Sequence, residues 1–312
     1  MNDNLRVNSQ KSYESLINIS DLVEILYKNI FLFVMLVSVF SISSVFFALS
    51  LNNKYESSAI LELSNLGTSS DSSMISSEYS SLAALGGISL SSGTNDRSDY
   101  VLKTLTSREF LKHLISFESV KENLFASKSF DQSTKEIIYD QEIFKDGKWV
   151  REVKENRSPE PSYHEVYKKI FLNNFSAKKD LDSGFIILSF EHISPIFAYD
   201  FLTLVINELN SITRIKDLNE TENMIDYLED QLPLTKEKNI KDTIYKLIAE
   251  ELKSKMIANV NEDYILKSID PPFIPEFKSS PNRPLICILG SLLGLLVGFL
   301  VCLIKFYNTN KN

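Results

Sequence analysis

Two long apolar runs, one near each end of the chain, constrain its fold more than any other feature. Residues 31–51 and residues 285–304 contain no charged side chain. As a helix, each run of about 20 residues is long enough to cross the ~30 Å hydrocarbon core of a bilayer. Residues 52–284, between the runs, are enough for a domain. This pattern excludes a purely soluble enzyme and a multi-span transporter, and it predicts a domain tied to a membrane at both ends.

Two spans place both termini on one side of the membrane and the intervening domain on the other. The first run follows 30 mostly polar residues and lacks a clear small-residue cleavage site, so we expect it to be retained instead of being removed as a signal peptide. The Lys and Arg residues around the runs weakly favour cytoplasmic termini. The expected organisation is a cytoplasmic tail (1–30), a first span (31–51), a periplasmic domain (52–284), a second span (285–304) and a cytoplasmic tail (305–312).

The charge balance and the cysteines narrow the possible partners. The formal net charge is −8, and most of the acidic excess lies between the two apolar runs. An acidic domain lacks the cationic surface that neutralises phosphates, so we expect no nucleic-acid partner. Cys287 and Cys302 both lie in the second run. No disulfide is therefore expected to brace the domain.

Motifs that carry catalytic chemistry are missing from the sequence. His113, His164 and His192 are far apart, and no HExxH, CxxC or GxSxG motif occurs. The Gly-Lys pair at Gly147 is followed by Trp149, where a P-loop needs a hydroxyl residue to hold Mg²⁺. We therefore expect no catalytic residue, no cofactor and no metal, and the chain is not predicted to be an enzyme.

The second apolar run contains three glycines, Gly290, Gly294 and Gly298, that recur every four residues and so fall on one face of a helix. A face without side chains lets two helices approach to backbone contact, which is the main attraction between helices in lipid. Residues 270–284, just before this run, hold five of the nine prolines in the chain. This segment is expected to form a stiff, non-helical strut.

The longest expected element is a helix over about residues 195–232. It begins at Ser194 and Pro195, because Ser can cap the first N–H groups and Pro has none to leave unpaired. A second helix is expected over about residues 235–258, after Pro233. A helix as long as the first exceeds what a compact domain needs, so part of it is expected to project away from other elements of its own chain.

The long helix carries an apolar stripe with two possible uses. Its residues either pack on the rest of the domain or contact another copy of the chain. The stripe consists of Phe201, Val205, Leu209, Ile212, Ile225 and Leu228.

Shorter elements complete the domain. Strands are expected at residues 55–63, 185–191 and 264–269, and the first and last of these are expected to pair with each other. Residues 99–118 have helical spacing with a break near Ser107. The serine-rich segment 64–98 is expected to be a mobile loop that docks through its apolar residues 82–90.

Three stretches of the sequence resemble the Wzz-type chain-length determinants, the polysaccharide co-polymerases of the bacterial inner membrane. They are ISDLVEILYKNIFLFVM, which leads into the first run, ANVNEDYILKSIDPPFIPEFKSSPNRPLICILGSLLG, which leads into the second, and MIDYLEDQL, which ends the long helix. Two further stretches, LAALGGISL and SREFLKHLI, resemble the variety that acts on lipopolysaccharide O-antigen.

The resemblance implies an α+β fold, with two terminal transmembrane helices flanking a periplasmic domain that has a membrane-proximal α/β base and a long protruding helix. It also implies a ring-like homo-oligomer that is not an enzyme. Such a protein regulates how many repeat units a separate Wzy-type polymerase adds to a lipid-linked glycan in lipopolysaccharide biosynthesis, and the domain itself is a candidate to contact that glycan. The family's proline- and glycine-rich motif maps onto Pro281, Pro284, Gly290, Gly294 and Gly298. Asn282 stands where a basic residue is common in the family.

Two other functions stay open at this point. One is a membrane adaptor of a capsule or exopolysaccharide export system, partnered with a separate tyrosine autokinase. Only eight residues follow Ile304, so a kinase domain is not expected within this chain. The other is a periplasmic ligand sensor, which also has two spans around one domain. It would need a signalling output, for which the 30 residues before the first span leave no room.

Overall fold

The computed structural model describes residues 27, 29–64, 94–153, 157–261 and 263–309. They fall into two units, which we call the anchor unit (residues 1–52 and 281–312) and the sheet domain (residues 53–280). The predicted docking patch, residues 82–90, lies outside the described residues.

The anchor unit consists of two apolar helices, α2 (Ile30–Ser50) and α11 (Arg283–Thr309). Both are long and apolar enough to cross a bilayer. They match the predicted spans closely, but α11 begins earlier than expected, so Pro284 lies in its first turn. The prediction of a non-helical strut was therefore wrong for residues 283–284. The first turn tolerates proline because its N–H groups have no partner within the helix.

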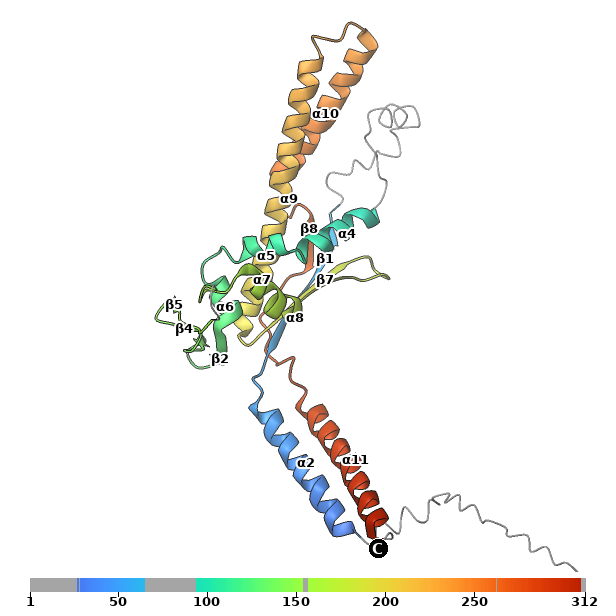
Figure 1. The fold of residues 1–312 in the computed structure, drawn as a ribbon. Helices are drawn as coiled ribbons and strands as arrows, with labels where there is room; N and C mark the ends of the chain where they lie inside the picture. Colours follow the sequence, from blue (N-terminus) through green and yellow to red (C-terminus); the bar gives the residue numbers. More distant parts are fainter. Residues whose placement is uncertain (1–26, 28, 65–93, 154–156, 262, 310–312) are drawn as a thin grey trace, which may run out of the picture. The chain divides into compact units, whose positions relative to one another are not determined.

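The sheet domain is built on a four-stranded antiparallel sheet in the order β6-β7-β1-β8 (Figure 1). The predicted strands are confirmed to within two residues, as is the pairing of the first with the last. The α+β fold class is therefore confirmed. The four strands are β1 (Tyr55–Leu63), β6 (Phe175–Lys179), β7 (Ile186–His192) and β8 (Leu266–Asp270).

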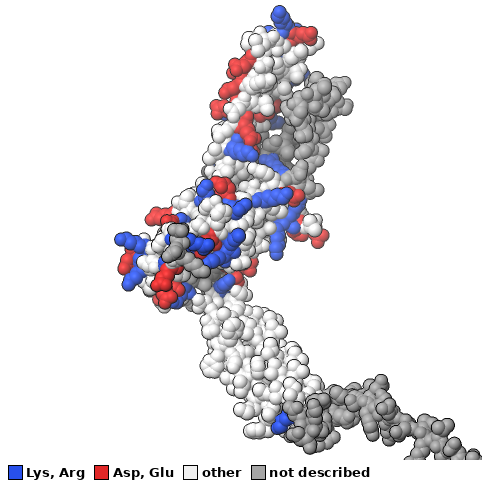
Figure 2. Space-filling model, in the orientation of Figure 1, with Lys and Arg blue, Asp and Glu red and all other residues white. Residues whose placement is uncertain are grey.

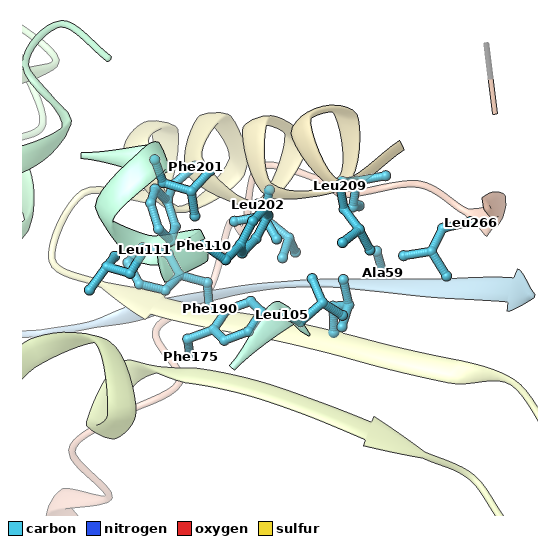
Figure 3. Packing of buried hydrophobic residues seen from close by; sticks show 14 of the residues in the cluster. Ala59, Leu105, Phe110, Leu111, Phe175, Phe190, Phe201, Leu202, Leu209 and Leu266 are labelled. Carbon is cyan, nitrogen blue, oxygen red and sulfur yellow. The ribbon is translucent and has the colours of Figure 1, made fainter. Parts of the chain in front are cut away.

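One face of the sheet carries the hydrophobic core (Figure 3). Alternate residues of β1 and β7 point into it, as the period of two along a strand requires. The ring of Phe190 on β7 lies 4.4 Å from the ring of Phe201 on the long helix, centroid to centroid. Figure 3 shows the helix residues Phe201, Leu202 and Leu209 above the sheet residues Ala59, Phe175 and Phe190.

Helices between β1 and β6 also contribute to this core. The predicted helical break near Ser107 is confirmed, because α4 ends at Leu105 and the Ser107 hydroxyl accepts a hydrogen bond from the Phe110 N–H at 3.1 Å, which caps α5. The helices of this region are α4 (Thr94–Leu105), α5 (Arg108–Leu114), α6 (Val120–Ala126), α7 (Tyr163–Val166), the π-helix η1 (Tyr167–Phe171) and α8 (Leu172–Asn174).

Two small hairpins lie in the chain between α6 and α7. The first joins β2 (Ser127–Asp131) to β3 (Glu136–Tyr139), and the second joins β4 (Phe144–Lys145) to β5 (Lys148–Trp149). The rings of Phe144 and Trp149 meet edge to face across the second hairpin, with centroids 5.0 Å apart. Such a contact stabilises a hairpin that is too short to be stable alone.

The long helix α9 (Pro195–Gln231) spans 37 residues and begins as predicted. The Ser194 hydroxyl accepts a hydrogen bond from the Phe197 N–H at 3.2 Å, and Pro195 occupies the first turn. The second helix, α10 (Lys238–Val260), folds back along α9 (Figure 1). The expectation that the end of α9 projects away from all other elements was therefore wrong. The short connection after Gln231 returns α10 antiparallel to α9, which buries the apolar stripe that α9 would otherwise expose.

Candidate functional site

The contact between α2 and α11 runs through the three glycines of α11. A Cβ atom at Gly290 would overlap the side chain of Ser44, and one at Gly294 would lie 2.8 Å from the Cβ of Phe40. Gly298 faces the ring of Phe33, to which a Cβ would come within 3.0 Å. The glycine face of α11 is therefore filled by side chains of α2, and substitution there would force the two helices apart.

Polar groups add to this contact. The hydroxyls of Ser41 and Ser291 lie 3.0 Å apart and share a hydrogen bond. Near the other end of the helices, the Arg283 guanidinium donates from Nε to the Ala48 carbonyl oxygen at 3.2 Å. In an apolar surrounding such bonds tie the helices in a fixed register.

The two ends of the sheet domain are joined by a cluster that we call the Glu191 clasp. The Glu191 carboxylate accepts hydrogen bonds from the hydroxyls of Ser279 (2.8 Å) and Ser280 (2.5 Å) and pairs with the Lys54 ammonium at 3.3 Å. The backbones of Lys54 and Ser280 also bond directly. Burial raises the pKa of Glu191, but the bonds from Ser280 and Ser279 and the charge of Lys54 outweigh it and lower that pKa below its usual value.

The predicted stripe of α9 divides between two environments. Phe201, Val205 and Leu209 are buried against the sheet, and Ile212 is half-buried beside them. Further along, Ile225 and Leu228 are buried where α10 packs on α9. The structure therefore uses these positions for packing within the chain.

A polar stretch of α9 separates these two parts of the stripe. The Lys216 ammonium donates to the Tyr100 hydroxyl of α4 at 3.2 Å. The Asp217 carboxylate accepts from the Tyr264 hydroxyl at 2.8 Å, and Glu222 pairs with Lys255 of α10 at 3.3 Å. Burial, and then the Asp217 carboxylate, raise the pKa of Tyr264 to about 12. Through these bonds, α9 is connected to three other parts of the chain: α4, α10 and the segment just before β8.

Sequence reasoning missed two buried polar residues at the base of α9. Asn210 accepts at Oδ1 from the N–H groups of Ile265 and Leu266 and donates from Nδ2 to the Leu266 carbonyl, at 2.8–3.0 Å. His192 accepts at Nδ1 from the Ser194 N–H at 3.1 Å, with Nε2 3.0 Å from the Asn123 carbonyl. The position of Asn210 on the buried side of the helix could have drawn attention to it, but nothing in the sequence pairs His192 with its partners.

The arrangement offers contact surfaces instead of a reaction centre. Among the residues that the structure describes, no group of three His, Cys, Asp or Glu side chains is placed to hold a metal ion. The candidate functional features are thus the glycine-mediated helix contact and the α9–α10 pair.

These features define a class: an α+β domain between two apolar helices that can span a membrane. The sequence of residues 15–117, which runs from before α2 to the end of α5, matches the family described as "Wzz: Chain length determinant protein". This third of the chain is therefore similar to the Wzz chain length determinant family, in agreement with the resemblance of the sequence stretches.

Two solved structures are similar to the chain. A full-length bacterial polysaccharide co-polymerase is 12% identical, with 95% of this chain and 99% of that one covered, at a TM-score of 0.37. A fragment of WzzB, a polysaccharide co-polymerase from Salmonella Typhimurium, is 13% identical, with 73% and 100% covered, at a TM-score of 0.26. A search of curated proteins found no match.

Proposed function

We propose that this chain regulates the length of O-antigen in lipopolysaccharide biosynthesis, acting with a separate Wzy-type polymerase. The family match over residues 15–117 carries this proposal. The choice of O-antigen is supported by the stretches LAALGGISL and SREFLKHLI, which resemble the O-antigen variety of the family.

The proposed location is the bacterial inner membrane, with α2 and α11 as its two spans. Residues 1–30 and 305–312 then lie in the cytoplasm, and residues 52–284 lie in the periplasm. Two spans require the termini to share one side, and the Lys and Arg distribution favours the cytoplasm for them. The proline- and glycine-rich residues Pro281, Pro284, Gly290, Gly294 and Gly298 have the role of holding α11 against α2.

The proposed mechanism is scaffolding by a ring-like homo-oligomer. Several copies side by side present one surface to the membrane-embedded polymerase or to the growing lipid-linked glycan, and the α9–α10 pair supplies contact area between copies. Exposed apolar residues support this use of the pair, since the side chains of Tyr227 and Met256 are 60% and 69% exposed.

Deletion of the gene tests this function. We expect the modal length of O-antigen to be lost, so that lipopolysaccharide on a gel shows a ladder declining steadily from short to long chains. Complementation with the wild-type chain should restore the mode. A ladder that is the same with and without the protein would reject the proposal.

The same deletion strain distinguishes the O-antigen function from the second candidate function, an adaptor of capsule or exopolysaccharide export. The description of the matched family specifies chain length but no particular glycan, which keeps this candidate open. If the adaptor function is correct, deletion leaves the O-antigen ladder unchanged and alters the size distribution of the capsule or exopolysaccharide, measured by gel filtration.

A further inference from the structure

The two helices of the α9–α10 pair differ sharply in charge. From Asp217 to Asp230, α9 contains six acidic residues and no Lys or Arg. Helix α10 contains five Lys against three acidic residues. Figure 2 shows acidic side chains gathered along the edge of the pair that α9 forms. The acidic excess of the pair thus lies on α9, and the excess of Lys lies on α10.

Part of this charge faces away from the partner helix and is not used within the chain. Ile225 and Leu228 mark the side of α9 that faces α10, and Ile244 and Ala258 mark the buried side of α10. With 100° between successive residues, six exposed charged residues of the pair point within roughly 50° of directly outward. Two of the six, Lys238 and Asp242, lie beyond the level at which α9 ends, and the other four lie within the length over which the two helices are paired. They are Asp226 and Asp230 on α9, which we call the acidic edge, and Lys246 and Lys253 on α10, which we call the basic edge. None of the four makes an ion pair with another residue in the described part of the chain.

The two edges also match in height along the pair. Glu222 and Lys255 are in contact, which places them at one level. At 1.5 Å per residue, Asp226 and Asp230 lie about 6 and 12 Å beyond that level, and Lys253 and Lys246 lie about 3 and 13.5 Å beyond it. The offsets are smaller than the reach of a lysine side chain. Copies that stand at the same height therefore bring each acid opposite a lysine.

We infer that the acidic edge of one copy binds the basic edge of the next copy. This inference rests on the proposed function in one respect: copies anchored in the same membrane by α2 and α11 stand at equal height. Exposed Tyr227 of α9 lies about 7.5 Å beyond the Glu222 level, and Ala249 of α10 lies about 9 Å beyond it. The ring of Tyr227 then packs on small Ala249 between the two lysines of the neighbouring copy, whose ammonium groups flank the aromatic face.

The contact is heterologous, because it joins two different edges. Each copy that uses its acidic edge still has its basic edge available, so the contact repeats from copy to copy. Identical copies anchored in one membrane are related by rotation about the membrane normal, so a constant rotation between neighbours closes the series into a ring. A two-fold contact between two identical acidic edges would instead place like charges together.

Charge reversal in the full-length, detergent-solubilised protein tests the pairing. One variant combines Asp226→Lys with Asp230→Lys, and a second combines Lys246→Glu with Lys253→Glu. We expect each to lower the assembly mass, measured by light scattering after gel filtration, because each contact weakens on the order of tenfold or more. The control combines Glu136→Lys with Asp182→Lys, which change the net charge by the same amount as the first variant, at exposed positions outside the pair, and should leave the mass unchanged.

Two rescues make the test specific. The chain with all four reversals should regain the wild-type mass, because its edges are again complementary. A one-to-one mixture of the two double variants, combined before solubilisation, should also assemble with the variants alternating. Each contact then joins either two reversed edges or two unreversed edges, and in both cases the facing charges are opposite. A structural defect caused by the substitutions would not be repaired in either way, and circular dichroism checks that each variant is folded.

The pairing is overturned if the folded double variants keep the wild-type mass, if neither rescue restores it, or if the wild-type protein is a monomer. These outcomes are separable from failure of the proposed function. If deletion changes the O-antigen ladder but charge reversal leaves the mass unchanged, the function stands and the pairing is wrong. If charge reversal and rescue behave as expected but deletion leaves the ladder unchanged, the pairing stands and the function is wrong.

Discussion

The two halves of α9 belong to one continuous helix but are stabilised in different ways. Residues 195–215 lie over the sheet, where Phe201, Leu202 and Val205 have almost no exposed surface. Residues 216–231 pack mainly on α10, apart from the hydrogen bonds of Lys216 with Tyr100 and of Asp217 with Tyr264, and most of their side chains are exposed. A helix held by a core on one side and by a single helix further along should therefore unfold from its distal end first.

The comparison also explains where each half can carry function. The proximal half has little freedom to change, because its residues fill a packed interior. The distal half needs only Ile225 and Leu228 on its inner side to hold α10, so its outer side is available for contacts with other molecules. The part of α9 that extends beyond the sheet is therefore the part that can bind another molecule.

The largest expected difference between the halves comes from truncating one aromatic side chain in each. Phe201→Ala should lower the free energy of unfolding by about 3–5 kcal/mol, because it leaves a cavity between α9 and the sheet. Tyr227→Ala, at an exposed position of the distal half, should change it by less than about 0.5 kcal/mol. Chemical unfolding of the purified protein, followed by circular dichroism, measures both. Equal effects would contradict the division of α9 drawn above.

Acid should destabilise the folded domain through His192, the last residue of β7. Burial lowers the pKa of His192 from 6.5 to about 4, so the unfolded chain binds a proton more readily than the folded one. The contribution of His192 to stability is therefore complete above pH 6.5 and is lost as pH falls toward 4, by up to about 3 kcal/mol.

Thermal unfolding between pH 7 and pH 5 measures this slope, and His192→Gln should remove it. Glu165 does not titrate between pH 7 and pH 5, because its pKa is lowered to about 2, mainly by its hydrogen bond to Arg151. The stability from that ion pair is present above about pH 4.5 and is lost only below it. If the stability of His192→Gln still falls between pH 7 and pH 5, another group is responsible for the pH dependence.

In the distal half, Leu228→Ala should cost about 2 kcal/mol, the low end for a buried leucine, because Leu228 lies outside the main core cluster. The effect should be local. Hydrogen exchange should increase in residues 216–260 and stay unchanged in β1 and β7. Faster exchange throughout the sheet would show that the two halves are coupled more tightly than their contacts indicate.

The smallest expected effect concerns the exposed ion pair between α9 and α10. Glu222→Ala removes the partner of Lys255 and should cost about 0.2–1 kcal/mol, since exposed pairs are screened by water and salt. The difference from wild type should disappear in 1 M salt, where the screening length falls to about 3 Å. Denaturant unfolding at low and high salt provides this comparison.

The elements of this protein were predictable where local signals are strong. Ser194 and Pro195 mark the start of α9 in the sequence alone, and the alternation in residues 55–63 marks β1. The partners of polar side chains were not predictable. Asn210 bonds to Ile265 and Leu266, more than 50 residues away in sequence, and only the packing of β8 beside α9 brings them together.

The fold-back of α10 escaped prediction for a similar reason. The apolar positions Ile225 and Leu228 indicate an inner side of the helix, but a periodic pattern does not say which element will cover it. The acidic and basic edges carry a clear compositional signal in the sequence. That signal gains meaning only when the two helices are known to lie side by side at a defined height.

The Glu191 clasp has a mechanical consequence. Tension applied to the chain at residues 53 and 280 would be carried first by the Lys54 and Ser280 backbone bonds and by the carboxylate that grips both serines. The load would pass across this junction without reaching β1 and β8, which therefore keep their register. The contacts of the Glu191 clasp would therefore have to break before a force on the two chain ends could separate β1 from β8.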